Sequence, residues 1–120
     1  MNPKRFMKKP KIYIGHIRDA IDNILEYVGN YTREDFASPE NIMVQDAVVR
    51  KMEIIGEAAR ALIQNIREED YPDIPWQKII GMRNRIAHEY FDVDLLLVWD
   101  TAVKDLPDLK IKLDQILTDM

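Results

Sequence analysis

The chain has no cysteine, so it can form neither a disulfide framework nor a thiolate metal site. Its two histidines, His16 and His88, are far too distant in sequence for the His-x3-His spacing of a helical zinc site. Its four glycines form no glycine-rich phosphate loop, and its carboxylates form no oxygen-ligand metal loop. The sequence therefore predicts no cofactor and no resident metal.

Long apolar runs are also missing. No run approaches the ~20 residues that a helix needs to cross a bilayer, and no uninterrupted apolar segment follows the basic N-terminus, so we expect no secretory signal. The length of 120 residues suits one domain, and 47% hydrophobic residues argue against disorder. We expect a soluble, cytoplasmic protein without a membrane segment.

Positive charge is scarce outside the N-terminus. The net charge is −4, yet the first eleven residues carry five basic side chains and no acidic one. These are Lys4, Arg5, Lys8, Lys9 and Lys11. We expect residues 1–10 to form a flexible basic tail and residues 11–120 to form a single domain. Because the remainder is acidic, it can bind a polyanion such as nucleic acid only through a local basic groove.

Helical periodicity dominates the rest of the chain. An apolar side chain recurs every three or four residues from Lys11 to Val28, which predicts a first helix. Ser38 and Pro39 form a start signal for a second helix that runs to about Ile66. Small residues cluster in that second helix and allow another helix to approach closely. They are Gly56, Ala58, Ala59 and Ala61.

Three shorter helices are expected after a proline-rich break. They cover about 76–87, 95–106 and 108–117, with Asp92 or Asp94 capping the second of them and Pro107 opening the last. This order of elements with short connections predicts an all-α fold, a bundle of four to five antiparallel helices.

The segment 82–91 carries the candidate chemistry. A wheel of 100° per residue that starts at Trp76 places Arg83 at about 340°, inside an apolar sector of roughly 120°. The same wheel places Arg85 at about 180°, on the opposite and solvated face. A buried Arg83 needs a partner. The partner is either an acidic side chain, such as a glutamate of the second helix, or a polar pocket at a subunit interface, or a phosphate ligand.

His88 has a side chain suited to proton transfer near neutral pH, although a histidine near a helix end also serves as a C-terminal cap. Asn84 lies four residues before His88, so both face one pocket if the helix continues that far. Arg83 and His88 are about 140° apart on a wheel. They converge only if the helix ends or distorts near His88, or if a second copy of the chain supplies one of them.

Arginine and histidine without a metal suit one reaction well. The 2′-hydroxyl of RNA attacks the neighbouring phosphate, histidine moves a proton, and arginine stabilises the charge on phosphorus. Because the substrate supplies the nucleophile, the protein needs none of its own.

The segment Arg83-x4-His88-x-Tyr90 resembles the Rx4HxY signature of HEPN domains. The flanking sequence resembles the HepT-like group of that class. It reads EIIGEAA at 53–59, IPW at 74–76, GMRN at 81–84, FDVD at 91–94 and VW at 98–99. The resemblance covers nearly the whole chain from about Lys11.

The resemblance implies a helical bundle that forms a homodimer, with the motifs of both copies lining one cleft. It implies a ribonuclease toxin of a toxin–antitoxin system. The antitoxin is a minimal nucleotidyltransferase that moves AMP from ATP onto the motif tyrosine. Arg83 and His88 then form the catalytic pair, Asn84 supports the site and Tyr90 is the modified residue. An adenylyl group on Tyr90 would place negative charge beside Arg83 and compete with RNA phosphate.

Two other interpretations stay open. The chain could be a non-catalytic helical partner that docks a nucleotidyltransferase and presents a substrate to it. It could also be a purely structural helical dimer, in which Arg83 forms a salt bridge and Tyr90 packs with Phe91 at a helix end.

Overall fold

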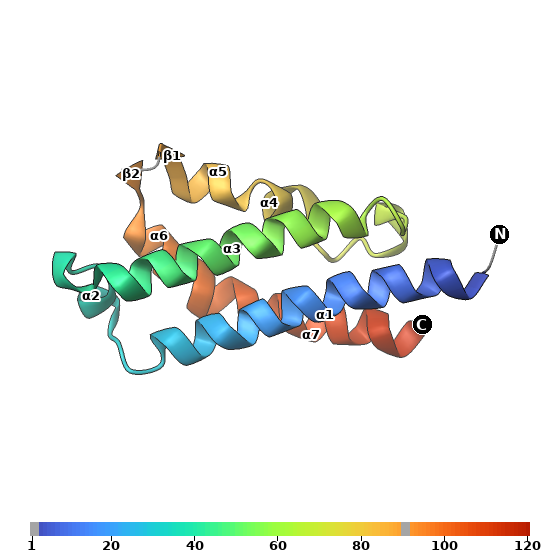
Figure 1. Cartoon of the computed structure of the whole chain (residues 1–120), viewed down its shortest axis with the longest axis horizontal. Coiled ribbons are helices and arrows are strands. Elements are labelled where there is room, and N and C mark those ends of the chain that lie inside the picture. Colours follow the sequence, from blue (N-terminus) through green and yellow to red (C-terminus); the bar gives the residue numbers. More distant parts are fainter. Residues whose placement is uncertain (1–2, 90–91) are drawn as a thin grey trace.

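Two long antiparallel helices, α1 (Pro3–Val28) and α3 (Ile42–Leu62), form the frame of the molecule (Figure 1). The computed structural model describes the backbone of residues 3–89 and 92–120, and the side chains of residues 9–82, 84, 85 and 93–120. The described bundle measures 52 × 27 × 22 Å. Successive long segments alternate in direction along its length, which confirms the prediction of an all-α antiparallel bundle.

Helix α1 contains the predicted apolar face. Its stripe residues are all buried: Ile14, Ile17, Ile21, Ile24 and Val28. The helix begins at Pro3, well before the predicted start near Lys11, and it includes Pro10. A separate basic tail over residues 1–10 stays a prediction.

Helix α3 is shorter than predicted. The segment after Ser38 first forms a 3₁₀ turn, η1 (Pro39–Asn41), so the α-helix begins only at Ile42. It ends at Leu62 rather than near Ile66, and Ile63 is its C-cap residue. The side-chain amide of Asn65 donates to the carbonyl of Ala61 at 2.9 Å and so satisfies one of the last-turn acceptors.

A four-residue helix, α2 (Arg33–Phe36), has no counterpart among the helices predicted from the sequence. The Thr32 hydroxyl caps it by accepting from the Asp35 amide at 3.1 Å. Phe36 is fully buried and lies against Trp99, with ring centroids 5.6 Å apart. The buried amide of Gln45 donates to the carbonyls of Phe36 and Ser38 at 2.8 and 2.7 Å. These contacts hold α2 against the frame.

The chain then returns along α3 in short pieces (Figure 1). A 3₁₀ turn η2 (Glu68–Asp70) is followed by α4 (Trp76–Ile80) and α5 (Met82–Ile86). Strands β1 (Ala87–Glu89) and β2 (Asp92–Val93) form an antiparallel pair, in register Ala87 to Val93 and Glu89 to Asp92. The sequence predicts a single helix over 76–87, so the break at Gly81 and the strand at Ala87 correct that prediction.

The C-terminal part follows one nearly continuous course. Helix α6 (Leu95–Asp100) passes through a π-helical segment η3 (Thr101–Asp105) into α7 (Leu106–Asp119). The Asp94 carboxylate caps α6 by accepting from the Leu97 amide at 3.0 Å, which decides between the two predicted caps. Pro107 occupies the first turn of α7 as expected, where a missing N–H costs nothing. The sequence predicts two separate helices on either side of Pro107, whereas the π-helical segment η3 joins α6 and α7 without a break.

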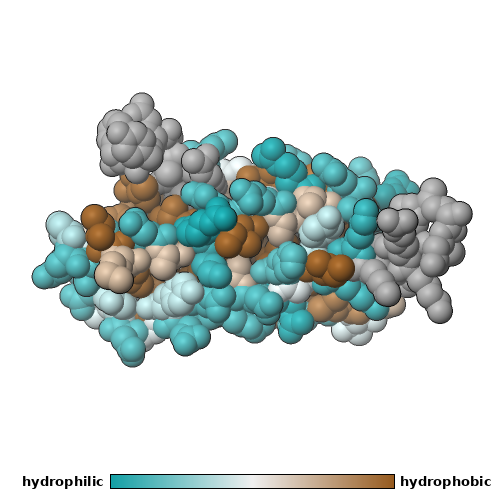
Figure 2. Space-filling view, viewed as in Figure 1, coloured by the Kyte–Doolittle hydropathy of each residue, from teal (hydrophilic) through white to brown (hydrophobic). Residues whose placement is uncertain are grey.

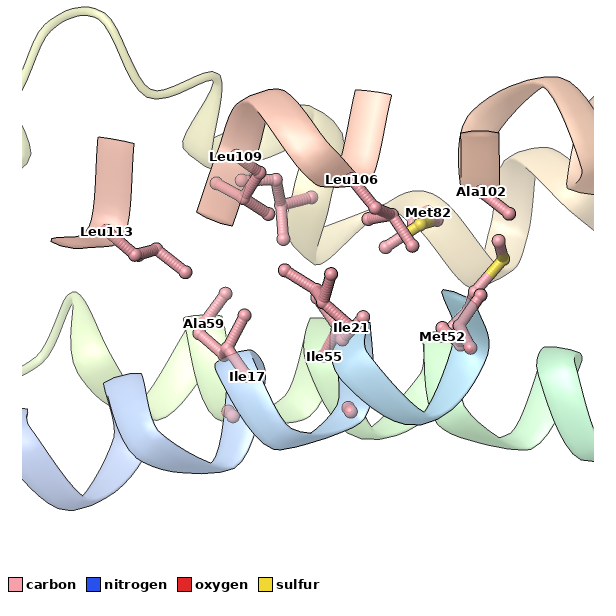
Figure 3. Packing of buried hydrophobic residues seen from close by; sticks show 14 of the residues in the cluster. Ile17, Ile21, Met52, Ile55, Ala59, Met82, Ala102, Leu106, Leu109 and Leu113 are labelled. Atoms are coloured by element: carbon pink, nitrogen blue, oxygen red, sulfur yellow. The ribbon is translucent and has the colours of Figure 1, made fainter. Parts of the chain in front are cut away.

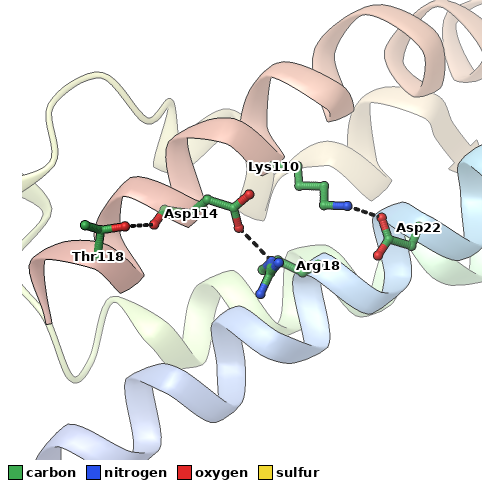
Figure 4. A network of polar contacts seen from close by, with 5 residues as sticks. All are labelled: Arg18, Asp22, Lys110, Asp114 and Thr118. Atoms are coloured by element: carbon green, nitrogen blue, oxygen red, sulfur yellow. Dashed lines mark hydrogen bonds and ion pairs between the residues drawn. The ribbon is translucent and has the colours of Figure 1, made fainter.

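One apolar core joins α1, α3, α5, η3 and α7. Figure 3 shows Ile17 and Ile21 of α1 pointing toward Leu109 and Leu113 of α7, beside the buried side chains of α3. At the edge of this core, Figure 4 shows two ion pairs between α1 and α7, Arg18 with Asp114 and Lys110 with Asp22. Both pairs are partly exposed, so each stabilises the fold by no more than about 1 kcal/mol. Burial of the core therefore holds α7 in place.

Figure 2 shows hydrophobic side chains as separate patches among hydrophilic ones on the face in view. No helix among the described residues is both long and apolar enough to cross a membrane.

Candidate functional site

Helix α4 positions the motif segment by a close approach to α3. An added Cβ at Gly56 would lie 3.2 Å from the carbonyl oxygen of Ile79 and 3.3 Å from that of Ile80. Trp76 is buried at the start of α4, and its indole N–H donates to the carbonyl of Tyr71 at 3.2 Å. The prediction that small residues of the second helix admit a neighbouring helix is confirmed at Gly56.

The break at Gly81 changes the helical phase that singles out Arg83. A continuous helix from Trp76 would place Met82 at about 240°, outside the apolar sector. Met82 is 2% exposed, so the buried face of this segment extends beyond the predicted sector. A wheel drawn through Gly81 therefore does not establish where Arg83 points, and its burial stays a prediction. Arg83 lies in α5, and its side chain lies outside the described side chains.

Helix α5 ends at Ile86, two residues before His88. His88 lies in β1, and its side chain also lies outside the described ones. Because the chain leaves the helix at this point, a single copy meets the condition under which Arg83 and His88 can converge. The 140° offset therefore does not argue for a dimer.

Asn84 is exposed on α5. The condition under which Asn84 and His88 would share one helical face is not met, since the helix does not reach His88. Tyr90 follows β1 in the chain and lies outside the described residues. The roles of all four residues stay predictions.

Helix α6 follows β2 in the chain, and two side-chain contacts hold it in place. Arg33 of α2 binds Asp100 of α6 through two hydrogen bonds, Nε to Oδ1 at 3.1 Å and a terminal nitrogen to Oδ2 at 3.2 Å. This hydrogen-bonded pair lowers the pKa of the Asp100 carboxyl and raises the pKa of Arg33. Together with the Asp94 cap, the pair anchors the helix that follows β2.

A hollow of about 430 Å³ lies between the first half of α3 and β2, and we call it the α3–β2 hollow. It is lined by Ile42, Gln45, Asp46, Val49, Arg50, Glu53, Val93 and Leu95. Arg50 pairs with Glu53 at 3.3 Å. With two carboxylates and one guanidinium, this lining does not favour a polyanion.

A second hollow of about 350 Å³ opens between α4–α5 and η3–α7, and we call it the α5–α7 groove. Its apolar lining consists of Pro75, Ile79, Met82, Leu106 and Leu109, and Thr101 also lines it. Its charged lining consists of Lys78, Arg85, Lys104, Lys112, Asp105 and Asp108. Four basic and two acidic side chains make this groove positive in a chain of net charge −4.

Sequence reasoning missed this groove and took Arg85 for an ordinary solvated charge. Arg85 is indeed exposed, but it faces residues of the C-terminal segment across a groove. The basic side chains come from α4, α5, η3 and α7, so only the tertiary structure brings them together. Among the described residues, no three histidine, cysteine or carboxylate side chains form a group that could hold a metal ion.

Comparison with known proteins gives the family. The family model described as ribonuclease HepT-like matches residues 17–116. A protein of Thermococcus cleftensis named "Probable ribonuclease HepT" is 38% identical over 106 residues, covering 88% of this chain and 94% of that protein. A protein of Methanocaldococcus jannaschii named "Putative RNase" is 37% identical over 118 residues, covering 98% of this chain and 93% of its own length.

A longer relative from Methanocaldococcus jannaschii is named as a gamma-glutamylcyclotransferase and putative RNase. It is 41% identical over 113 residues, and the match covers 94% of this chain but half of that protein. No solved structure matches the chain significantly. With the family model spanning most of its length, the chain belongs to the ribonuclease HepT-like family.

Proposed function

We propose that the chain is an RNA endonuclease that acts as the toxin of a toxin–antitoxin system. The observation that carries the proposal is the family match over residues 17–116, which includes the whole Arg83-x4-His88-x-Tyr90 motif. The ribonuclease names of relatives that align along nearly their whole length support the same activity.

The proposed reaction needs no metal ion. The 2′-oxygen of the substrate attacks the adjacent phosphorus, the bond to the 5′-oxygen breaks, and a 2′,3′-cyclic phosphate and a 5′-hydroxyl are formed. His88 takes the proton from the 2′-hydroxyl or gives one to the leaving 5′-oxygen. Arg83 stabilises the negative charge that builds on the phosphoryl oxygens. Asn84 helps to orient the site from α5.

We assign the functional unit as a homodimer whose two motifs line one cleft. Each copy has a single motif histidine, and a reaction with one proton removed and one delivered uses two proton carriers well. Two copies of His88 in one cleft supply that pair. The dimer is proposed on this chemistry and on the family, because the strand at Ala87 removes the geometric argument for it.

Regulation is proposed at Tyr90. The phenolic oxygen attacks the α-phosphorus of ATP in the active site of a minimal nucleotidyltransferase antitoxin, and pyrophosphate leaves. The AMP group adds a phosphodiester charge and a bulky nucleoside next to the motif. Both would exclude an RNA phosphate from Arg83. A mass shift of one or more AMP units on the peptide containing Tyr90, accompanied by loss of cleavage, tests this step.

The activity is tested by digesting RNA in excess EDTA with protein purified without the antitoxin. We expect cleavage by the wild type and none by Arg83→Ala or His88→Ala. Matched controls are Arg60→Ala, an exposed arginine of α3, and His16→Ala, a histidine on the solvent side of α1, which should cleave normally. Cleavage that survives both motif substitutions would remove the site assignment.

A mixed dimer of wild-type and His88→Ala chains tests how the site is built. If the reaction uses the His88 of both copies in one cleft, the mixed dimer lacks one of the two proton carriers and cleaves far more slowly than at half of the wild-type rate. If each copy holds a complete site of its own, about half of the activity remains. A tight complex with the nucleotidyltransferase but no cleavage by any preparation would favour the non-catalytic partner instead.

A further inference from the structure

The α5–α7 groove has the chemistry of a binding site for a nucleic-acid backbone. Lys112 is already engaged, since its ammonium donates to the carbonyl of Asp73 at 2.9 Å and pairs with Asp108 at 3.0 Å. Lys78, Arg85 and Lys104 form no ion pair within the described part of the chain. Three cations that form no ion pair therefore line the groove, against the carboxylate of Asp105, and Lys104 interacts electrostatically with Asp100 of α6 without forming an ion pair.

The local balance of charge around these cations indicates where a polyanion can bind. The chain has more acidic than basic side chains, and a polyanion can bind it only where basic residues gather locally. The α3–β2 hollow has the opposite balance, with Asp46 and Glu53 against Arg50. Among the two hollows next to the motif segment, the α5–α7 groove is the one that favours phosphate.

The groove also lies next to the motif. Arg85 is two residues from Arg83 on the same helix, a rise of about 3 Å along the axis and a turn of about 200° around it, so RNA in the groove must pass around the end of α5 to reach Arg83. Met82, the residue before Arg83, forms part of the apolar floor. At the other end, the hydrogen bond from Lys112 to the carbonyl of Asp73 links α7 to the loop before α4. A strand that lies in the groove therefore leads from α4 toward the motif.

We propose that the α5–α7 groove binds the backbone of single-stranded RNA beside the cleavage site, with Lys78, Arg85 and Lys104 contacting phosphates. Apolar side chains of Ile79, Met82 and Leu109 offer the bases a surface to lie on. Asp105 lines the same groove and opposes binding. This proposal rests on the proposed ribonuclease function and gives its substrate a path, and it makes Arg85 a binding residue rather than a solvated charge.

The test measures binding separately from cleavage. The probe is a fluorescein-labelled 2′-O-methyl oligouridylate of twelve nucleotides, which cannot be cleaved because its 2′-oxygen is blocked. Fluorescence anisotropy gives the Kd of the full chain across a series of salt concentrations. The triple variant Lys78→Gln, Arg85→Gln, Lys104→Gln is compared with a control triple variant on other surfaces, Lys51→Gln, Arg60→Gln, Arg67→Gln, which changes the net charge equally.

Each phosphate contact on a single strand contributes about 0.7 to the slope of log K against log salt. Loss of three contacts should flatten the slope by about 2 and weaken binding up to about 100-fold at 0.1 M salt. The control triple variant should bind nearly as the wild type does. Asp105→Asn should tighten binding. Uridine 5′-monophosphate at the same phosphate concentration should compete poorly, because it cannot contact several cations at once.

Equal loss of affinity in both triple variants would overturn the proposal, since binding would then follow net charge alone. Full competition by the mononucleotide would overturn it too, by assigning the groove to a free nucleotide. The proposed function fails separately: binding through the groove without any cleavage of unmodified RNA would leave this inference standing and remove the ribonuclease assignment.

Discussion

The contact between Gly56 and α4 allows a quantitative prediction about how the motif segment is held. Replacing Gly56 by alanine adds a Cβ that would lie 3.2 and 3.3 Å from two backbone carbonyl oxygens of α4. Such contacts are tighter than ordinary van der Waals distance, and a helix backbone cannot turn away as a flexible side chain can. Relieving them requires α4 to move, which costs about 1–3 kcal/mol as for other overpacked sites.

A matched control sits in the other long helix. A Cβ added at Gly15 of α1 would have no neighbouring atom within 4 Å, so Gly15→Ala adds a methyl group into open space. Both substitutions gain the same helix propensity, roughly 1 kcal/mol. The difference between the two variants therefore isolates the steric cost, and we expect Gly56→Ala to be less stable than Gly15→Ala by about 1–3 kcal/mol.

Urea unfolding followed by tryptophan fluorescence measures this difference, with Trp76 of α4 as one of the two reporters. Gly15→Ala should unfold at a higher urea concentration than the wild type, and Gly56→Ala at a lower one or close to it. Displacement of α4 should also lower RNA cleavage, because the motif follows it directly. If Gly56→Ala is as stable as Gly15→Ala, the close approach does not position the motif segment.

Three further predictions concern the elements around the site. Thr101→Val should raise the free energy of unfolding by about 1 kcal/mol, because the buried Thr101 hydroxyl has no hydrogen-bond partner among the described residues; a lower midpoint in thermal denaturation would contradict this. Phe36→Ala should cost about 3–5 kcal/mol in urea unfolding, because Phe36 is fully buried against Trp99. The hydrogen bond with Arg33 lowers the pKa of Asp100 from its usual 3.8. The stabilisation of the fold by this ion pair is therefore fully present above pH 3.8 and is lost as the pH falls through the lowered pKa. Asp100→Asn should therefore be less stable than wild type near neutral pH, and the two should converge in acid; parallel curves would show that the pair does not titrate as inferred.

The long helices could be predicted from sequence because each carries its own pattern. The apolar stripe of α1 and the small residues of α3 are local features, and burial follows them directly. The Asp94 cap is likewise a local bond between neighbours in the chain. Element type and contact face were predictable wherever a helix spans several turns.

The motif segment could not be predicted in the same way. Its helices have five residues each, so a wheel drawn through Gly81 carries a phase that the backbone does not keep. The π-helix between α6 and α7 has no sequence signal of its own, and α2 depends on contacts with Gln45 and Trp99 from distant segments. The motif is visible as a residue pattern, while the basic groove beside it depends on the tertiary fold.

The ends of the RNA products test the central claim most directly. The wild-type chain is incubated with a defined RNA in excess EDTA, and the termini are identified by mass spectrometry. The proposed Arg83 and His88 chemistry predicts fragments with a 2′,3′-cyclic phosphate and a 5′-hydroxyl, absent from the His88→Ala digest. Fragments with a 5′-phosphate, or cleavage that stops when EDTA is added, would contradict a metal-independent attack by the 2′-hydroxyl.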